Sequence, residues 1–272
     1  MVNSGQNLVL VGAGKMGAAM LSGWLDQSVD VQNFYILDPQ MPQPVPALAK
    51  RYNLVLNPAL SDIENVGTVV LAVKPQVMAD VAQEIVALSQ HKPVFVSIAA
   101  GCTIASFETV FGGDAAIVRA MPNTPAAIGR GMTVACGNSS VGQKQKDFAT
   151  QLLEAVGKVA WVEDEGLLDP VTAVSGSGPA YVFLLAECMA QAGVAAGLPP
   201  ELAEQLARET VSGAGELLAQ SDEAAGQLRE NVTSPGGTTA AALEILRGPQ
   251  GLAELMTKAV EAATKRSREL AG

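Results

Sequence analysis

Short apolar runs rich in β-branched residues alternate with longer helical stretches through the first 160 or so residues. Continuous apolar runs between helices are typical of strands buried on both faces of a parallel sheet. Seven runs fit this pattern: "LVLVGAG" (8–14), "FYILDP" (34–39), "TVVLAVKP" (68–75), "PVFVSIAAG" (93–101), "AAIVRAMPN" (115–123), "MTVACGN" (132–138) and "KVAWVED" (158–164). Several end in Gly, Pro or Asn, which predicts loops at the carboxyl ends of the strands, where open α/β sheets bind ligands.

From about residue 165 the strand pattern disappears and Ala-rich helical segments take over. We expect helices over 166–196, 199–220, 223–231, 238–247 and 249–270. The chain is therefore predicted to hold two domains. Residues 1–163 form a Rossmann-like α/β domain with a mostly parallel sheet and helices on both faces, and residues 164–272 form an all-α domain.

The helix around Ala180–Ala196 has little polar face, so it is expected to be covered on all sides. A small domain rarely covers a helix that fully, which suggests a partner subunit. The stretch 171–198 also merits a test as a membrane span, because Glu187 is its single charge. Polar residues, glycines and Pro179 interrupt it, so we expect a buried helix of a soluble protein instead.

Composition narrows the choice of partners. The formal charge is -10, and basic runs or basic-aromatic stripes are missing from the sequence, which argues against nucleic acid and anionic membranes. Three widely spaced cysteines without a Cys-x-x-Cys pair indicate neither a disulfide framework nor a zinc site, and no other metal is expected. The amino terminus lacks the pattern of a signal peptide. A cytoplasmic location fits these features.

A glycine-rich turn follows the first predicted strand and opens a helix. "GAGKMG" comprises Gly12, Ala13, Gly14, Lys15, Met16 and Gly17, and Asp38 ends the second strand 21 residues beyond Gly17. This context predicts dinucleotide binding: the first glycine makes the turn, the second admits the pyrophosphate, and the third lets helix pack on strand. Asp38 would hydrogen-bond the ribose. Taken alone it favours NADH over NADPH, because a carboxylate repels a 2'-phosphate and no Arg or Lys occurs between Asp38 and Lys50.

Two later strand ends are expected to border the nicotinamide side of the same crevice. They are "AVKP", comprising Ala72, Val73, Lys74 and Pro75, and "AAG", comprising Ala99, Ala100 and Gly101. The segment Arg119–Gly131 ends another strand in small polar residues and suits a cleft wall. His91, the single histidine, precedes a strand and is expected at the opposite edge of the sheet, in a structural or surface role.

The helical half offers few proton donors. Its only lysines are Lys258 and Lys265, its only tyrosine is Tyr181, and it has no histidine. Ketone reduction requires a donor for the developing alkoxide, whereas a protonated C=N group accepts hydride directly. The composition therefore favours imine reduction, although a Ser, Thr or water donor for a ketone stays open.

The stretch "NVTSPGGTTAAALEIL" (231–246) breaks the helical pattern with Pro, Gly and Thr just ahead of a helix. Such a stretch exposes backbone N–H groups, and the helix that follows adds its own, which is how an anion site is built. From these residues alone, a solvated linker between two helices remains an alternative.

Six motifs together resemble the pyrroline-5-carboxylate reductases over essentially the whole chain. They are "GAGKMG", "AVKPQ", "SIAAG", "RAMPNTP", "VSGSGPAYVF" and "ENVTSPGGTTAAALEIL", in the family's order and spacing. The resemblance implies NAD(P)H-dependent reduction of 1-pyrroline-5-carboxylate to L-proline, the last step of proline biosynthesis. It also implies that residues 1–163 bind the dinucleotide and that residues 164–272 serve dimerisation and substrate binding, in a homodimer that can assemble further.

The resemblance implies roles for several residues of the 231–246 stretch and for an acidic residue before it. The N–H groups around Gly237 and Thr238 would hold the substrate carboxylate, the hydroxyl of Thr239 would meet the ring nitrogen, and Val232 would form apolar wall. The family's acidic residue before the loop corresponds to Asp222, with Glu223 as the neighbouring candidate. Family members commonly prefer NADPH and often have a neutral residue where Asp38 stands, so this position is a departure.

Two other classes of function are weighed against this one. A β-hydroxyacid dehydrogenase would share the two-domain plan, but it expects a catalytic lysine in the helical domain that the sequence lacks there. A catalytically silent nucleotide-binding scaffold would have no need of the Gly-Gly-Thr-Thr loop.

Overall fold

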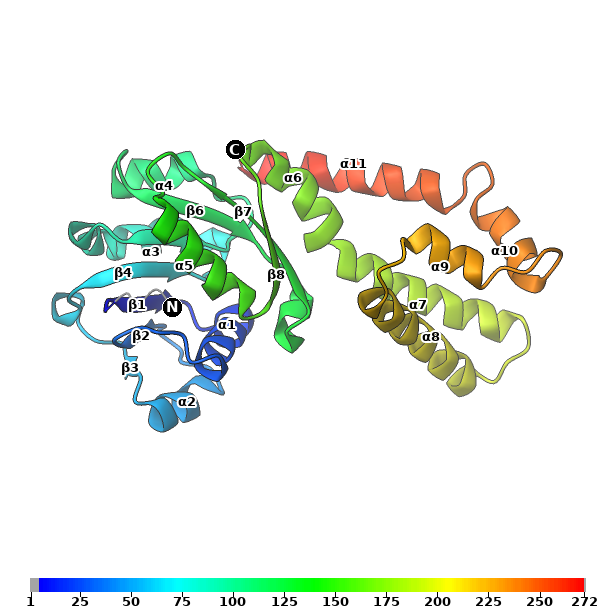
Figure 1. The fold of residues 1–272 in the computed structure, drawn as a ribbon, viewed down its shortest axis with the longest axis horizontal. Coiled ribbons are helices and arrows are strands. Elements are labelled where there is room, and N and C mark those ends of the chain that lie inside the picture. The colour runs from blue at the N-terminus through cyan, green and yellow to red at the C-terminus, as the bar shows by residue number, and fades with distance from the viewer. Residues whose placement is uncertain (1–4, 272) are drawn as a thin grey trace. The chain divides into compact units, whose positions relative to one another are not determined.

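The computed structural model describes residues 5–271 and divides into two compact units. One unit contains the chain up to Gly176 together with the segment from Ala263 onward, and the other comprises Ser177–Ala262 (Figure 1). A functional boundary at 163/164 remains a prediction drawn from the end of the strand pattern.

An eight-stranded sheet forms the centre of the first unit. Its order is β3-β2-β1-β4-β5-β6-β7-β8, and every neighbouring pair is parallel except β6 and β7. The strands are β1 (Asn7–Val11), β2 (Phe34–Leu37), β3 (Val55–Leu56), β4 (Val66–Leu71), β5 (Val94–Ser97), β6 (Ala116–Met121), β7 (Gly131–Gly137) and β8 (Gly157–Trp161). The seven expected strands are present, and the two-residue β3 is an addition.

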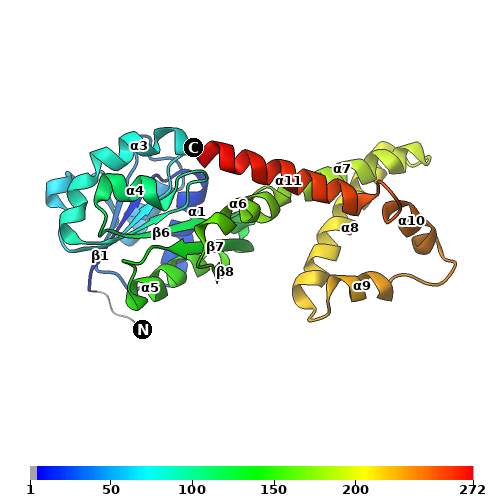
Figure 2. The ribbon, with the colours of Figure 1, turned by 90° about the horizontal axis from the view of Figure 1, so that it is seen from above.

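Side chains from both faces of β1 are buried, which explains its continuous apolar sequence. Leu8 and Leu10 join the core under α1 (Lys15–Asp26), α2 (Val45–Tyr52) and α5 (Gln143–Glu154), whereas Val9 and Val11 join the core under α3 (Pro75–Glu84), α4 (Ile104–Phe111) and α6 (Leu168–Val171). Figure 2 shows α3 and α4 on one side of the sheet and α5 on the other. Short 3-10 turns connect these elements: η1 (Leu60–Asp62), η2 (Val86–His91), η3 (Thr124–Ile128) and η4 (Glu165–Leu167).

The second unit consists of helices, as expected. They are α7 (Gly178–Ala195), α8 (Pro200–Gln220), α9 (Ala225–Asn231), α10 (Thr238–Leu246) and α11 (Leu252–Ala271), whose last turns belong to the first unit. The expected helix 166–196 is divided, because a π-helical turn, η5 (Thr172–Gly176), separates α6 from α7. Pro179 in the first turn of α7 has no N–H to donate backward, so a regular helix cannot run through this point.

The apolar helix α7 is not covered within one chain. None of its residues is buried, and Phe183 and Leu184 are 69% and 57% exposed. The helical run Glu165–Ala195 is long and apolar enough to cross a membrane by length and composition alone. The expectation that α7 is enclosed therefore requires cover from outside the chain.

We predict that Trp24→Phe lowers the free energy of unfolding by about 1–3 kcal/mol, because it removes a buried hydrogen bond and leaves a void. Trp24 is fully buried, and its Nε1 donates to the carbonyl oxygen of Leu152 at 2.8 Å, joining α1 to α5. Trp161→Phe is the matched control, since the half-buried Trp161 donates to Thr150 Oγ1 near the sheet edge. Urea denaturation measures both, and equal losses would contradict the assignment.

Candidate active site

The turn between β1 and α1 is shaped by its three glycines. Gly12 has φ +90, and a Cβ there would lie 2.8 Å from the carbonyl oxygen of Ala72. A Cβ on Gly17 would collide with the carbonyl oxygen of Gly12. Gly14 differs, because it is exposed and a Cβ added there would meet no atom within 4 Å. Two glycines thus pack the turn, and the third keeps its outer surface open.

This open surface fits the pyrophosphate of a dinucleotide. Gly14 precedes α1 in an extended conformation, and no side chain caps the N-terminus of the helix. The first N–H groups of a helix are unpaired and carry partial positive charge, so they attract an anion. Ala13 is fully buried beneath the turn, whereas Lys15 is exposed and Met16 is half-buried.

The strand order places the expected cofactor residues of the first unit along one edge of the sheet. β1 lies between β2 and β4, so the chain leaves the sheet centre in opposite directions on either side of β1, and such a switch point forms a ligand crevice. Ala72 directly follows β4, and its N–H donates to the carbonyl oxygen of Val11 at 2.7 Å. The same carboxyl edge carries Val73, Lys74 and Pro75 after β4 and Ala99, Ala100 and Gly101 after β5.

Asp38 follows β2 and touches the glycine-rich turn. Its Oδ2 accepts a hydrogen bond from the N–H of Ala13 at 2.7 Å. The side chain of Asn57, beyond β3, pairs with the Asp38 backbone through two hydrogen bonds of 3.0 and 2.9 Å. Two separate segments, the glycine-rich turn and the residue beyond β3, therefore fix Asp38 beside the turn.

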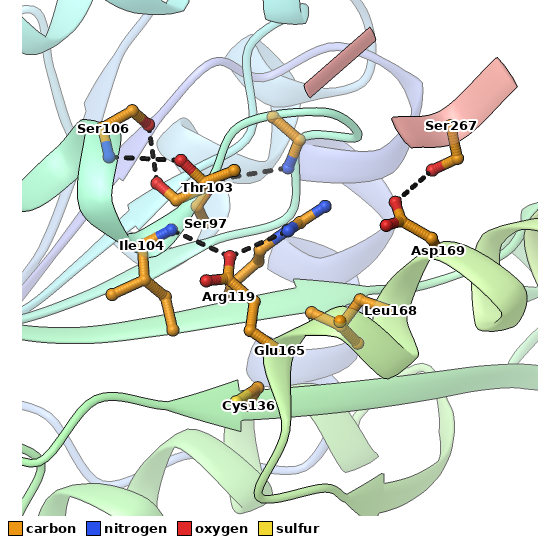
Figure 3. A network of polar contacts seen from close by, with 12 residues as sticks. Ser97, Thr103, Ile104, Ser106, Arg119, Cys136, Glu165, Leu168, Asp169 and Ser267 are labelled. Carbon is orange, nitrogen blue, oxygen red and sulfur yellow. Dashed lines mark hydrogen bonds and ion pairs between the residues drawn. The ribbon is translucent and has the colours of Figure 1, made fainter. Parts of the chain in front are cut away.

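A partly buried ion pair holds the loop after β5 (Figure 3). Arg119 on β6 is only 5% exposed and donates from Nη1 to Glu165 Oε1 at 2.8 Å. The same oxygen accepts the backbone N–H of Ile104, the first residue of α4, at 2.9 Å. Thr103 caps this helix by accepting from the N–H of Ser106. The position of the Ala99–Gly101 loop therefore depends on a carboxylate from beyond β8.

The cysteine of this loop is unsuited to thiolate chemistry. Burial raises the pKa of the Cys102 thiol, and the nearby Arg119 charge opposes the shift only in part. Burial also raises the pKa of Cys136, reinforced by the carboxylates of Glu165, Glu163 and Asp164. Both groups therefore stay protonated at neutral pH, which leaves no basis for a cysteine nucleophile here. Among residues 5–271, no cluster of His, Cys, Asp and Glu is arranged to bind a metal.

The segment expected to form a cleft wall contacts the π-helical turn of the same unit. Asn123 donates from Nδ2 to both the carbonyl and the hydroxyl oxygen of Ser175 at 3.2 Å. Its Oδ1 accepts the N–H of Met132 at 2.9 Å. One amide side chain thus ties the end of β6 to β7 and to η5. His91 lies at the end of η2, before β5, at the amino edge of the sheet away from these loops.

In the second unit, the Pro-Gly-Gly segment forms a β-turn directly before α10. The N–H of Gly237 donates to the carbonyl oxygen of Ser234 at 3.0 Å, and Gly236 has φ +68. Proline followed by a residue with positive φ is the signature of a type II turn, which explains Pro235 and Gly236. Gly237 is the N-cap residue directly before α10, and its carbonyl oxygen accepts from the N–H of Ala241.

The N-terminus of α10 offers unpaired donors. No side chain caps the helix, and within the described part of the chain the N–H groups of Thr238, Thr239 and Ala240 have no acceptor. The hydroxyls of Thr238 and Thr239 likewise have no partner among residues 5–271, and Thr239 is half-buried. Because the N–H of Gly237 is used inside the turn, the free donors of this loop begin at Thr238.

Acidic residues near this loop differ in their contacts. Glu223 Oε2 accepts a hydrogen bond from Asn231 Nδ2 at 2.9 Å, which links the segment just before α9 to the last residue of that helix. Asp222, one residue earlier, is exposed, as is Val232, whose side chain is 64% exposed directly ahead of the loop. The structure thus gives Glu223 a defined contact beside the loop.

Three supporting residues were not expected from the sequence: Asn57, Glu165 and Asn231. Each acts on a partner at least eight positions away, so no local pattern marks it. Of the three, only Asn231 lies within a motif recognised in the sequence, where it directly precedes Val232.

Comparison with known proteins agrees with this arrangement. Residues 165–270 match the family model for pyrroline-5-carboxylate reductase dimerisation, and residues 7–101 match that for coenzyme F420-dependent NADP oxidoreductases. The pyrroline-5-carboxylate reductase of Pseudomonas aeruginosa is 39% identical over 97% of this chain and 96% of its own. That of Synechocystis is 40% identical over 97% of both chains.

Solved structures give the same result for the fold. A pyrroline-5-carboxylate reductase from Coxiella burnetii superposes with a TM-score of 0.90 at 35% identity, over 98% of this chain and 99% of that one. The pyrroline carboxylate reductase of Plasmodium falciparum, solved with NADP bound, has a TM-score of 0.81 at 29% identity, over 99% of both chains. With the glycine turn, the switch-point crevice and the Pro-Gly turn before α10 in place, this chain belongs to the pyrroline-5-carboxylate reductase family.

Proposed function

We propose that this chain reduces 1-pyrroline-5-carboxylate to L-proline with NADPH or NADH, and that the loop before α10 holds the substrate. The uncapped N-terminus of α10, with its free N–H groups beside two threonine hydroxyls, carries this proposal. Membership of the family supports the reaction itself. The direct test mixes the protein with pyrroline-5-carboxylate and follows the loss of NAD(P)H absorbance, with proline identified as the product.

The residues assigned to cofactor binding lie in the first unit. Gly12, Gly14 and Gly17 give the turn that receives a pyrophosphate, and the strand ends at 72–75 and 99–101 are assigned to the nicotinamide side. The reduced nicotinamide supplies a hydride when bound. The chain contributes the surface that orients the ring and excludes water from it.

The residues assigned to substrate binding lie in the second unit. The N–H groups of Thr238 and the following residues would hold the carboxylate, helped by the positive end of α10. This modifies the sequence expectation, since Gly237 contributes its conformation and its N–H stays in the turn. Val232 would contact the apolar ring face, and Thr239 would donate to the ring nitrogen.

Reduction of the imine requires few protein groups beyond these. Hydride adds to the C=N carbon of the protonated imine, which becomes C5 of proline, the electron pair of the C=N bond moves onto nitrogen, and the product amine then takes a proton from water. Positive charge is already present on the substrate, so no strong acid is required. As the ring nitrogen becomes tetrahedral, its lone pair accepts a hydrogen bond from the hydroxyl of Thr239. This bond stabilises the transition state more than the ground state.

An acidic residue near the ring nitrogen would stabilise the iminium charge. Asp222 has the family's position, whereas Glu223 has the longer side chain and the hydrogen bond to Asn231. The geometry favours Asp222 for this role, because its exposed carboxylate is free of side-chain partners in the described chain. Glu223 then fixes α9 beside the loop.

We further propose a homodimer, or an assembly of such dimers, in the cytoplasm. Helices α7 and α8 enclose an apolar groove of about 910 Å³, lined by Val182, Phe183, Ala190, Val194 and Val211 among others. The matching of residues 165–270 to a dimerisation model supports a second copy as the cover, in place of lipid. The three cysteines are free thiols, consistent with a reducing compartment.

Gly14→Ala is expected to weaken cofactor binding at least tenfold while leaving the fold intact. The added methyl group meets no protein atom within 4 Å, so its only obstacle is the approaching pyrophosphate. Titration of nicotinamide fluorescence measures the dissociation constant, and urea denaturation checks stability. Gly113→Ala, also in open space but outside the turn, is the control. An unchanged dissociation constant would place the pyrophosphate elsewhere.

Thr239→Val is expected to lower kcat by roughly 10- to 100-fold, or about 1.4–2.7 kcal/mol, because it keeps the shape and deletes the hydroxyl. Cofactor affinity should stay nearly unchanged. Thr238→Val serves as the control and should cost less, since Thr238 is assigned a backbone role. A Thr239→Val enzyme with unaltered kcat and KM for pyrroline-5-carboxylate would remove the hydroxyl from the site.

Sedimentation velocity at micromolar protein, without detergent, should show dimers or multiples of dimers. Phe183→Glu puts a charge on the most exposed large hydrophobic residue of α7 and should shift the protein toward monomer with loss of activity. Val86→Glu, at the amino edge of the sheet, is the matched control. A stable, fully active wild-type monomer would refute the dimer, and a requirement for detergent would favour a lipid cover.

A further inference from the structure

We infer that this enzyme uses NADH in preference to NADPH, and that the carboxylate of Asp38 sets that preference. The family comparisons leave the choice open, because one relative was solved with NADP bound and the second family model describes NADP oxidoreductases. The inference rests on the contacts of Asp38 and on the charges around it. It relies on the proposed function only where turnover is measured.

The Asp38 carboxylate is anchored by backbone donors. Oδ2 accepts the N–H of Ala13 at 2.7 Å, and Oδ1 accepts the N–H groups of Gln40 and Met41 at 2.8 and 3.3 Å. The Asn57 side chain makes two hydrogen bonds with the Asp38 backbone. The carboxylate thus has little freedom to swing away from the glycine-rich turn when a ligand enters.

One acceptor position remains for a ligand. A carboxylate has about four acceptor sites, of which three are occupied by these N–H groups. Asp38 is half-buried, so its remaining side is open at the carboxyl end of β2. A free ribose 2'-hydroxyl can donate to this site. A 2'-phosphate has only negative charge and acceptor atoms to offer, so it would be repelled.

Basic residues that could offset this repulsion are few near the site. None occurs from residue 39 to residue 49, and Arg51, at the end of α2, lies over the ring of Tyr52 at 5.1 Å. Lys50 occupies the last turn of the same helix. Lys15, the first residue of α1, is exposed and is the cation closest in sequence to the turn.

Asp38 also has a structural role as the cap of the turn at residues 38–41, and this role alone would not affect cofactor choice. The two roles predict different results. If Asp38 only caps the turn, its replacement weakens NADH and NADPH equally. If it selects the cofactor, the ratio of the two affinities changes.

The first measurement uses the wild-type protein and needs no substrate. Titration of nicotinamide fluorescence gives dissociation constants for NADH and NADPH, and NADH is expected to bind at least tenfold more tightly. Tighter or equal binding of NADPH would overturn the inference. The ratio of kcat/KM values with pyrroline-5-carboxylate should show the same preference. If both cofactors bind but neither is oxidised, the proposed reaction fails while the binding ratio still decides cofactor choice.

The second measurement uses Asp38→Ser and Asp38→Asn, which remove the charge and retain a polar group for the turn. Both should move the NADH-to-NADPH ratio of kcat/KM, and of affinity, at least tenfold toward NADPH, equivalent to about 1.4 kcal/mol. Asp62→Asn removes an exposed carboxylate from η1, before β4, and should leave the ratio unchanged. An unmoved ratio in both Asp38 variants would reduce Asp38 to a turn cap.

Lys15→Gln provides a separate arm that does not depend on the stability of the Asp38 variants. Under the inference, this change affects both cofactors alike and leaves their ratio within about twofold. If Lys15→Gln instead raises the NADH-to-NADPH ratio tenfold, Lys15 binds a 2'-phosphate and the inference is wrong. Thermal unfolding of every variant shows whether a lost affinity reflects the site or the fold.

Discussion

The close approach of the β1–α1 turn to the end of β4 is the constraint on which the cofactor site depends. Gly12 lies so near the carbonyl of Ala72 that no side chain fits, and the N–H of Ala72 returns a hydrogen bond to Val11. Gly12 also donates its N–H to the carbonyl oxygen of Leu37 at 2.8 Å. One turn therefore fixes the relative positions of three strand ends and aims the N-terminus of α1 outward.

The anion site proposed in the second unit also depends on an uncapped helix N-terminus. A turn centred on Pro235 and Gly236 delivers the chain to α10 without a side-chain cap, so the first N–H groups of the helix stay unpaired. An unpaired helix terminus costs stability unless water or a ligand satisfies it. An unpaired terminus is suited to binding a carboxylate, which is the role proposed for it, with the hydroxyl of Thr239 proposed to donate to the reacting nitrogen.

Much of this could be predicted from the sequence, because local patterns carry it. The strand runs, the glycine spacing with Asp38 behind it, and the Pro-Gly-Gly segment each occur within a short stretch. The two-residue β3 was missed because Val55 and Leu56 are too few to form a pattern. The pairs Arg119–Glu165 and Glu223–Asn231 were missed because each joins residues whose separation in sequence implies no contact. The π-helical turn was missed because its residues are ordinary helix formers up to Gly176.

The proposed reaction requires direct transfer of hydride from C4 of the nicotinamide to the C=N carbon. It is tested most directly with nicotinamide cofactor deuterated at C4 and with unlabelled pyrroline-5-carboxylate in ordinary water, followed by NMR of the proline formed. Direct transfer places one deuterium at C5 of proline when the cofactor carries the label on the transferred face. In the converse experiment, with unlabelled cofactor in heavy water, the hydride position at C5 should carry no deuterium. Cofactor-derived deuterium at any other carbon, or solvent-derived deuterium at that position, would contradict it.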